Sequence, residues 1–357
     1  MPAESKALDF FLGSNTPLGF VSKYAELSDT NRIERLFCVK GGPGTGKSGM
    51  MKTVAQKFAG DSMELIHCAS DADSLDAVIL HDRKIAIADA TLPHAIEPRY
   101  PGAFESTVFL NDCWDEAYLF DNRREIIGLV RENGACHERC RRLLSSAGAL
   151  LNDTYWMARE ITNERKVIKR AEAVYRRNVG KPQAKGGERV RLLSAITNKG
   201  PVCFESTAQT LCEKIVFLED SFGAASRIFM NRIREMANAE GHSLVTCFCP
   251  MAPFDKIDHL FFPELGAGFM VNSCYHKLLL PPSRRIYAAA FTDKEKLNLL
   301  KPAAAKNKKA VRQLLAEASG CLRQAKAVHD KLEEFYIAAT DFKKVDKKTD
   351  ELIAKLK

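Results

Sequence analysis

The segment RLFCVKGGPGTGKSGMMKTVAQKFA, residues 35–59, decides the fold of this chain. Its apolar run at 36–39 predicts a buried strand, and the residues after Lys47 have the spacing of an amphipathic helix. Between them, residues 41–48 satisfy the pattern GxxxxGK[ST], which forms a phosphate-binding loop when it lies between a strand and a helix. The sequence therefore predicts an α/β fold with a site for a nucleoside triphosphate.

Each residue type in this loop suits phosphate binding. The glycines let the backbone turn its amides towards an anion without Cβ clashes, and the following helix adds its positive amino end. Lys47 is expected to bridge the β- and γ-phosphates, and the Ser48 hydroxyl to bind Mg²⁺. The predicted nucleotide-binding residues are Gly41, Gly42, Pro43, Gly44, Thr45, Gly46, Lys47, Ser48 and Gly49.

A second element, KIAIADA at residues 84–90, ends an apolar run on a carboxylate. This pattern is typical of a strand whose terminal Asp helps to hold Mg²⁺. We expect Asp89 to act with Lys47 in catalysis and with Ser48 as a metal ligand. Ala90 stands where many ATPases place a glutamate that polarises the attacking water. No general base is evident, and slow intrinsic turnover is expected.

The chain also repeats itself along its length. The first half contains FLGSNTPLGFVSKYAEL, the phosphate-loop segment, MELIHCASDADSLDAVIL and KIAIADATLPH; the second contains LLSAITNKGPVCFESTA, KIVFLEDSFGAASRIFMNRIREMA, SLVTCFCPMAPFDKIDHLFF and LGAGFMVNSCYH. The aligned pairs include Cys68 with Cys249, Asp76 with Asp258, and His94 with His276. We therefore predict two duplicated P-loop NTPase-like cores.

Short apolar runs alternate with helical patterns in both halves, which predicts parallel sheets. A Gly, Pro and Lys-rich stretch at 179–188 separates two domains, 1–180 and 188–357. Apolar residues three to four apart predict helical hairpins or arms at about 122–180 and about 293–357. One such helix contains CHERC, whose cysteines we interpret as buried rather than metal-binding.

The loop of the second half has lost its phosphate-binding residues. Ungapped alignment of EDSFGAASRIFM on KGGPGTGKSGMM places Asp220 at Gly41, Ala225 at Gly46, Ser226 at Lys47 and Arg227 at Ser48. Val271 or Asn272 stands where the first half has Asp89. A carboxylate repels phosphate, and an arginine cannot replace a hydroxyl on Mg²⁺. We expect one functional site per chain and a pseudo-domain that serves architecture, partner binding or regulation.

These residues resemble a known family. The segments FLGSNTPLGFVSKY, GGPGTGKS, HCASDADSLDAV, IADATLPHAIEPRYPGAFE and LNDCWDE are similar to a sparsely characterised bacterial family of tandem P-loop ATP-binding proteins. The resemblance covers both halves and implies two P-loop cores with helical insertions, with ATP bound at residues 41–48 and Asp89. In that family the second loop is often intact, so the changes at 220–227 count against a two-site mechanism.

Composition indicates the class of protein and the redox environment that the chain suits. Its 357 residues have 46% hydrophobic and 27% charged residues, as in ordinary globular proteins. We see no export signal or membrane span, and eleven cysteines without CxxC pairs fit a reducing cytoplasm. The net charge of +8 is concentrated in residues 159–191, with 11 Lys and Arg against 4 Asp and Glu, and 294–357, with 16 against 9.

Three functions are compatible with these features. The first is a slow ATPase or nucleotide-dependent switch that uses ATP and Mg²⁺ and moves the helical arms. The second is a small-molecule or nucleotide kinase, with an acceptor near Asp71, Asp73 or Arg99 and lid arginines from Arg123, Arg124, Arg141 and Arg142. The third is a scaffold with structural ATP that binds a protein partner or nucleic acid. Lysines interspersed with acids, as in DFKKVDKKTDELIAKLK at 341–357, and the small number of aromatics among the basic residues favour a solvated helix face over nucleic acid.

Overall fold

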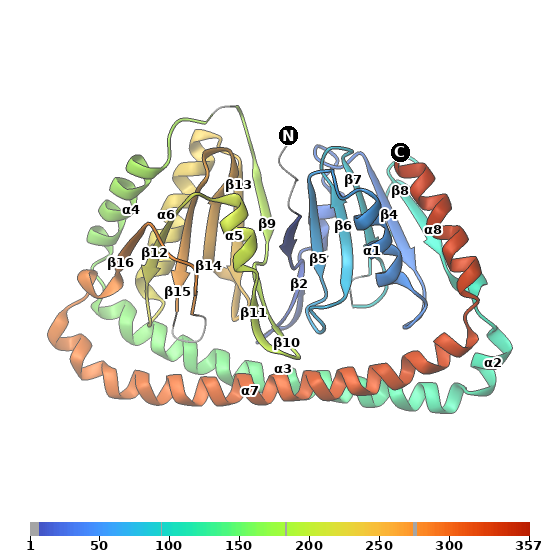
Figure 1. Ribbon diagram of the computed structural model, residues 1–357. Coiled ribbons are helices and arrows are strands. Elements are labelled where there is room, and N and C mark those ends of the chain that lie inside the picture. Colours follow the sequence, from blue (N-terminus) through green and yellow to red (C-terminus); the bar gives the residue numbers. More distant parts are fainter. Residues whose placement is uncertain (1–6, 94, 183, 274–276) are drawn as a thin grey trace.

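The computed structural model describes residues 7–93, 95–182, 184–273 and 277–357 of an α/β chain. Two six-stranded mixed sheets stand side by side above two long helices, α3 (Arg123–Ile161) and α7 (Lys294–Ala339) (Figure 1). These two helices pack against each other and extend beneath both sheets. No helix in the described ranges combines the length and apolar character needed to cross a bilayer.

The first sheet has the strand order β1-β5-β6-β7-β4-β8. Its strands are β1 (Leu8–Phe10), β4 (Arg35–Lys40), β5 (Met63–His67), β6 (Leu75–Leu80), β7 (Ile85–Asp89) and β8 (Glu105–Phe109). The connecting elements are hairpin β2 (Gly13–Thr16) and β3 (Gly19–Ser22), the 3₁₀ turns η1 (Tyr24–Ser28) and η2 (Asn111–Cys113), and helices α1 (Lys47–Lys57) and α2 (Glu116–Asp121).

The second sheet repeats this order as β9-β13-β14-β15-β12-β16, with the same sense of pairing at every step. Its strands are β9 (Glu188–Arg191), β12 (Lys214–Glu219), β13 (Leu244–Cys249), β14 (Ala252–Phe262), β15 (Ala267–Asn272) and β16 (Arg284–Tyr287). The connecting elements are hairpin β10 (Ser194–Thr197) and β11 (Gly200–Cys203), helices α5 (Glu205–Leu211) and α6 (Ala224–Glu240), and turns η3 (Pro263–Leu265) and η4 (Ala288–Phe291).

The prediction of parallel sheets is wrong for one strand in each half. β6 runs antiparallel to both β5 and β7, and β14 runs antiparallel to β13 and β15. Only the short turn 68–74 separates β5 from β6, whereas parallel neighbours need a long crossover connection. Residues 68–74 therefore form a turn that leads into a strand buried on both faces.

Both sheets are covered on both faces. In β4, Leu36 and Cys38 point into a core shared with the second sheet, while Phe37 and Val39 point towards α1. β12 alternates in the same way between the shared core and α6. The result is four layers, in which the two sheets form the middle and helices cover each outer face.

The last helix of each half covers the other half's sheet. Helix α4 (Glu164–Asn178) ends the first arm and packs on α6, whereas α8 (Phe342–Leu356) ends the second arm and packs beside α1 (Figure 1). The buried residues of α4 are Val167, Ala171, Val174 and Tyr175, and those of α8 include Val345, Leu352, Ile353 and Leu356. The arms are thus exchanged between the two cores.

The contacts that join the halves occur in matched pairs. Phe11 and Leu192, at corresponding places after β1 and β9, exchange backbone hydrogen bonds of 2.8 and 3.0 Å. The amide of Asn163 donates to Phe291 O at 2.8 Å, and that of Asp341 donates to Cys113 O at 2.7 Å. Residues 163 and 341 are 178 positions apart, as are 113 and 291. The joints therefore obey an approximate two-fold relation.

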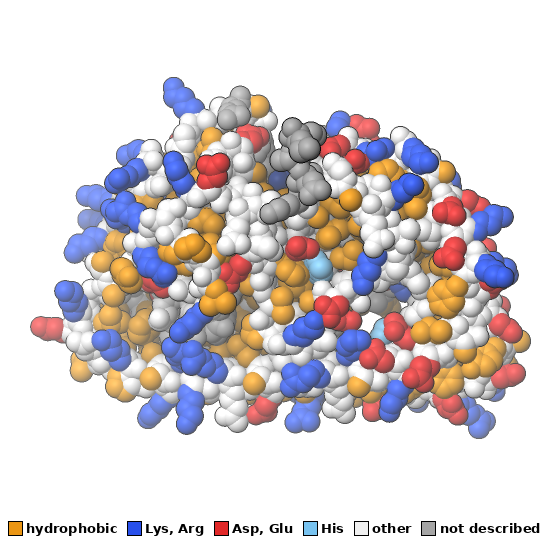
Figure 2. Space-filling model, viewed as in Figure 1, with side chains coloured by type: hydrophobic (Ala, Val, Ile, Leu, Met, Phe, Trp, Pro, Cys, Tyr) orange, Lys and Arg blue, Asp and Glu red, His pale blue; other side chains and the backbone are white. Residues whose placement is uncertain are grey.

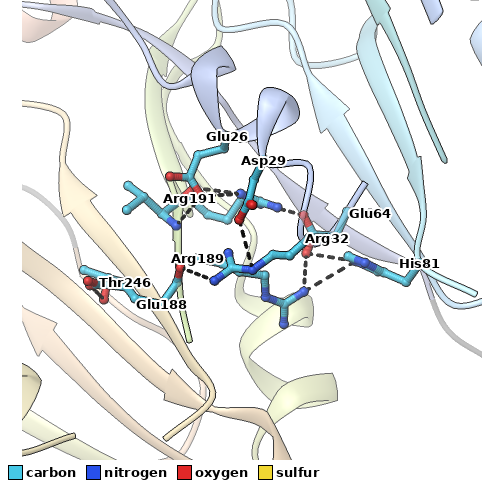
Figure 3. A network of polar contacts seen from close by, with 10 residues as sticks. Glu26, Asp29, Arg32, Glu64, His81, Glu188, Arg189, Arg191 and Thr246 are labelled. Atoms are coloured by element: carbon cyan, nitrogen blue, oxygen red, sulfur yellow. Dashed lines mark hydrogen bonds and ion pairs between the residues drawn. The ribbon is translucent and has the colours of Figure 1, made fainter. Parts of the chain in front are cut away.

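A buried ionic network also joins the halves (Figure 3). Glu64 on β5 is 0% exposed and accepts hydrogen bonds from Arg191 Nε at 2.5 Å and Arg189 Nη1 at 3.0 Å, both on β9. His81 Nε2 lies 3.1 Å from the same carboxylate. Burial alone would raise the pKa of Glu64, but Arg191, the His81 hydrogen bond and Arg189 hold it below its usual value.

Substitution Arg191→Met should lower the free energy of unfolding by about 3 kcal/mol, because it leaves the buried Glu64 charge poorly compensated. Denaturant unfolding measures this, with Arg142→Met as control, since Arg142 pairs with Glu138 on the surface at 3.3 Å. Because the pKa of Glu64 is lowered in the folded state, its ionised carboxylate stabilises the fold fully above about pH 4.5, the ordinary pKa of the group. This contribution to the free energy of unfolding is lost as pH falls further. Equal acid sensitivity in wild type and Glu64→Gln would contradict this account.

Candidate functional site

The phosphate-loop segment adopts the strand, loop and helix expected of it. β4 ends at Lys40 and α1 begins at Lys47, at the carboxyl edge of the first sheet. Gly44 has φ of 69° and Gly46 has φ of 90°, in the left-handed region that glycine enters without strain. The loop thus presents backbone amides beside the amino end of α1, the arrangement that binds anions in proteins.

Lys47 points back over this loop. Its Nζ donates to the carbonyl oxygens of Gly41 at 2.9 Å and Gly42 at 2.7 Å, and lies 3.7 Å from Asp89 Oδ2. Both charged side chains are mostly buried, with 12% and 15% exposed. An ammonium group is therefore held at the mouth of the loop beside a carboxylate.

Asp89 ends β7, the strand directly beside β4, and pairs across the sheet with Val39. Its Oδ1 accepts hydrogen bonds from the Thr91 amide at 2.8 Å and hydroxyl at 2.5 Å, which fixes the carboxylate. Ser48 Oγ accepts from the Leu75 amide at 3.0 Å. Lys47, Ser48 and Asp89, predicted to act together, all line one cavity.

This cavity has a volume of about 1280 Å³ and lies between the phosphate loop and the two long helices. It exceeds the 300–1,000 Å³ or so of ordinary small-molecule pockets. α3 contributes His137, Glu138 and Arg141, and α7 contributes Lys326, His329, Asp330 and Glu333. Burial, with repulsion from His329, lowers the pKa of His137, so this imidazole is mainly neutral at neutral pH.

Helix α7 sits directly on the phosphate loop. Glu333 Oε1 accepts a hydrogen bond from the Gly44 amide at 3.2 Å, so a carboxylate from α7 occupies one of the loop's backbone donors. A Cβ on Gly44 would lie 3.0 Å from the Glu333 backbone, and one on Gly42 would lie 2.4 Å from the Tyr336 ring. These two glycines are thus required by the close approach of α7 as well as by the turn.

The structure separates the other candidates proposed from sequence. Asp71 and Arg141 line the cavity, whereas Asp73 binds Lys199 at 2.5 Å on the surface. Asp73, Arg99, Arg123, Arg124 and Arg142 are not among the residues of the cavity wall. Cys136 and Cys140 are buried as interpreted, but His137 between them faces the cavity. His94 and His276 lie outside the described residues.

Sequence reasoning missed the contribution of the helical arms. His137 and Glu333 are about 90 and 290 positions from the phosphate loop, on stretches whose pattern predicts only amphipathic helices. No local signal identifies them. Their position over the loop depends on how far each arm extends and on which of its faces points towards the first sheet, and neither can be predicted from an amphipathic pattern alone.

The ungapped alignment of the second loop is wrong by two residues. Gly223, with φ of 84°, immediately precedes α6, as Gly46 immediately precedes α1. The loop between β12 and α6 is therefore two residues shorter, and Ala224 rather than Ser226 takes the place of Lys47. Val271, opposite Leu218, corresponds to Asp89, opposite Val39. The conclusion that the second loop lacks phosphate-binding side chains is unchanged.

The amides of the second loop are already occupied by a carboxylate from the loop itself. Asp220 is 3% exposed; its Oδ1 accepts from the Phe222 amide at 3.1 Å and the Gly223 amide at 2.9 Å. Its Oδ2 accepts from the Ser226 amide at 2.7 Å. Arg227 pairs with Asp255 and stacks on Tyr155, so it is not directed at the first loop. The adjoining cavity has about 330 Å³.

Comparisons of the chain with models of protein families, with curated proteins and with solved structures found no match in any of the three. The function proposed for this chain therefore rests on the geometry of the site and on the sequence of its loop.

Asp220→Ala should lower the free energy of unfolding by about 2–4 kcal/mol, because three buried amides lose their acceptor. Asp220→Asn keeps one oxygen and should cost less. Thermal and denaturant unfolding measure both variants beside Asp255→Asn, which alters an exposed carboxylate of the same cavity. An effect of Asp220→Ala no larger than that of Asp255→Asn would show that the internal carboxylate is dispensable.

Proposed function

We propose that this chain binds Mg-ATP at one site, formed by residues 41–49 and Asp89, and acts as a nucleotide-dependent switch with slow ATPase activity. The observation that carries the proposal is the position of Lys47 Nζ. It lies 2.9 and 2.7 Å from two loop carbonyls and 3.7 Å from Asp89 Oδ2, which supports the roles expected of a P-loop lysine and an acidic residue on the neighbouring strand.

The residues present fit the proposed ligands. Backbone amides, the amino end of α1 and Lys47 supply positive potential for phosphates, and the Ser48 hydroxyl and Asp89 carboxylate are oxygen ligands of the kind Mg²⁺ prefers. The ion would neutralise phosphate charge as it develops during transfer. Ala90, buried beside Asp89, offers no base, which accords with slow turnover.

The same reasoning makes the second half a pseudo-domain. We regard the two halves as duplicated P-loop NTPase-like cores, because their strand orders and joints correspond one to one. Asp220 accepts hydrogen bonds from the backbone amides of the second loop, and Ala224 stands at the position that corresponds to Lys47. One nucleotide per chain follows.

Contact between α7 and the loop favours a switch over a kinase. Any phosphate bound to the Gly44 amide competes with the Glu333 carboxylate, so nucleotide and α7 compete for the same donor. Because α7 extends beneath both sheets, its displacement reaches the second half. A kinase would need a second site for an acceptor, and of the four lid arginines considered, only Arg141 lines the cavity.

Substitution Lys47→Ala should weaken Mg-ATP binding at least 100-fold, because it removes the cation that faces the phosphates. Calorimetric titration gives affinity and stoichiometry, and we expect one nucleotide per wild-type chain. Lys57→Ala, at the exposed end of α1, is the matched control. Two nucleotides per chain, or unchanged binding by Lys47→Ala, would refute the proposed single site.

Substitution Glu333→Gln should tighten Mg-ATP binding about tenfold, because it removes a negative charge that competes with phosphate for the Gly44 amide. Glu334→Gln changes an exposed carboxylate one residue further along α7 and should leave the affinity unchanged. The same calorimetric titration measures both. If Glu333→Gln bound ATP no more tightly than Glu334→Gln, the competition between α7 and the nucleotide would be disproved.

A further inference from the structure

The two basic stretches of the sequence meet at one end of the molecule. Thr162, just before α4, pairs with Thr292, just before α7, and the Asn163 amide donates to Phe291 O at 2.8 Å. Helix α4 and the first turns of α7 therefore begin side by side, although about 130 residues separate them in the sequence. We call this surface, formed by residues 164–178 and 294–312, the basic end.

The basic end carries a strong excess of positive charge. Residues 164–178 contain six Lys and Arg against two Glu, and residues 294–312 contain seven against one Glu. Figure 2 shows Lys and Arg side chains spread over the end of the molecule that holds α4 and the start of α7, with few Asp and Glu among them.

The approximate two-fold relation supplies an internal comparison. The counterparts of these segments, 178 positions away, are 342–356 and 116–134, with five and three Lys and Arg against three and four Asp and Glu. The two ends thus have thirteen basic and three acidic residues against eight and seven. Segments 164–178 and 294–312 occupy places in the fold equivalent to those of 342–356 and 116–134. Because the second pair has a nearly balanced charge, the fold does not require the excess positive charge of the basic end.

Few of these cations are neutralised within the chain. Among the described basic residues of α4, only Arg176 lies within 4.0 Å of a carboxylate, that of Glu172. Arg165, Lys166, Lys169 and Arg177 form no ion pair in the part of the chain that the structure describes, and Lys294, Lys296, Lys301, Lys306, Lys308 and Lys309 likewise form none there. Unpaired like charges on adjoining helices repel one another, and a bound polyanion would relieve that repulsion.

The apolar residues at this end distinguish a nucleic acid from a lipid surface. Helix α4 buries its apolar side chains against α6, so it has no apolar face with which to enter a bilayer. The large exposed apolar side chains within or close in sequence to the basic end are Trp156 on α3, 56% exposed, Tyr287, 60% exposed, and Leu299 on α7, 79% exposed. Exposed aromatic rings beside cations are the features on which single-stranded nucleic acids stack.

We propose that the basic end binds single-stranded nucleic acid, with α4 and the start of α7 contacting phosphates and Trp156 available for base stacking. In the absence of nucleotide this binding does not require the nucleotide site, because it uses residues at the opposite end of α7 from Glu333. The balanced charges of the other end make that end a non-binding counterpart.

Fluorescence anisotropy with a labelled 20-nucleotide oligouridylate or oligothymidylate tests the proposal. Arg165→Gln/Lys166→Gln/Lys169→Gln should weaken binding at least tenfold at 0.1 M salt and reduce the slope of log affinity against log salt by about 2–3. The control is Lys343→Gln/Lys344→Gln/Lys347→Gln, the same positions on α8, which should bind as wild type does. Trp156→Ala should weaken binding without changing the salt slope.

Thermal unfolding of each variant shows whether the fold is intact, and Lys47→Ala should bind the oligonucleotide as wild type does. Absence of binding by the wild type, or equal losses in the α4 and α8 variants, would overturn the proposal. Binding to vesicles that contain phosphatidylserine, without binding to either oligonucleotide, would assign the basic end to a membrane surface instead.

Discussion

The arrangement of this molecule depends on the exchange of its two terminal helices. Neither sheet is complete alone: α8 covers the face beside α1, and α4 covers the equivalent face beside α6. Burying one aliphatic side chain of this size stabilises a protein by about 1.5–3 kcal/mol, so several such residues per helix give a strong reason for the exchange. The exchange requires α3 and α7 to run the length of the molecule, and it is this course that brings α7 over the phosphate loop.

The two loops differ in how a carboxylate meets their backbone amides. In the second half, Asp220 belongs to the loop and accepts three hydrogen bonds. In the first half, Glu333 belongs to a separate helix and accepts one, at 3.2 Å. Release of Asp220 breaks three hydrogen bonds within the loop, whereas release of Glu333 breaks one hydrogen bond between α7 and the loop. The second loop is two residues shorter and its amides bind its own carboxylate, whereas the first loop has no carboxylate of its own on its amides.

Sequence patterns predicted those elements that depend only on neighbouring residues. Residues 41–48, strand 85–89 with Asp89, and helices beginning after Asn122 and Asp293 are as expected, because glycine spacing and apolar period fix them. The antiparallel course of β6 was missed because alternating strand and helix patterns predict parallel neighbours, whereas only the short turn 68–74 joins β5 to β6. The second loop was misaligned because two residues are absent from it. His137 and Glu333 could not be predicted, since their place depends on how two arms cross.

The exchange also has a consequence for biosynthesis. Helix α8 follows every other described element in the chain, so the ribosome makes it last, about 300 residues after the phosphate loop. Until then the outer face of the first sheet, including Met51 and Val54 of α1, lacks the apolar side chains of α8 that bury it in the complete fold. Domains generally fold as units, amino-terminal first, during synthesis. Here the amino-terminal core instead stays partly uncovered until α8 has been made.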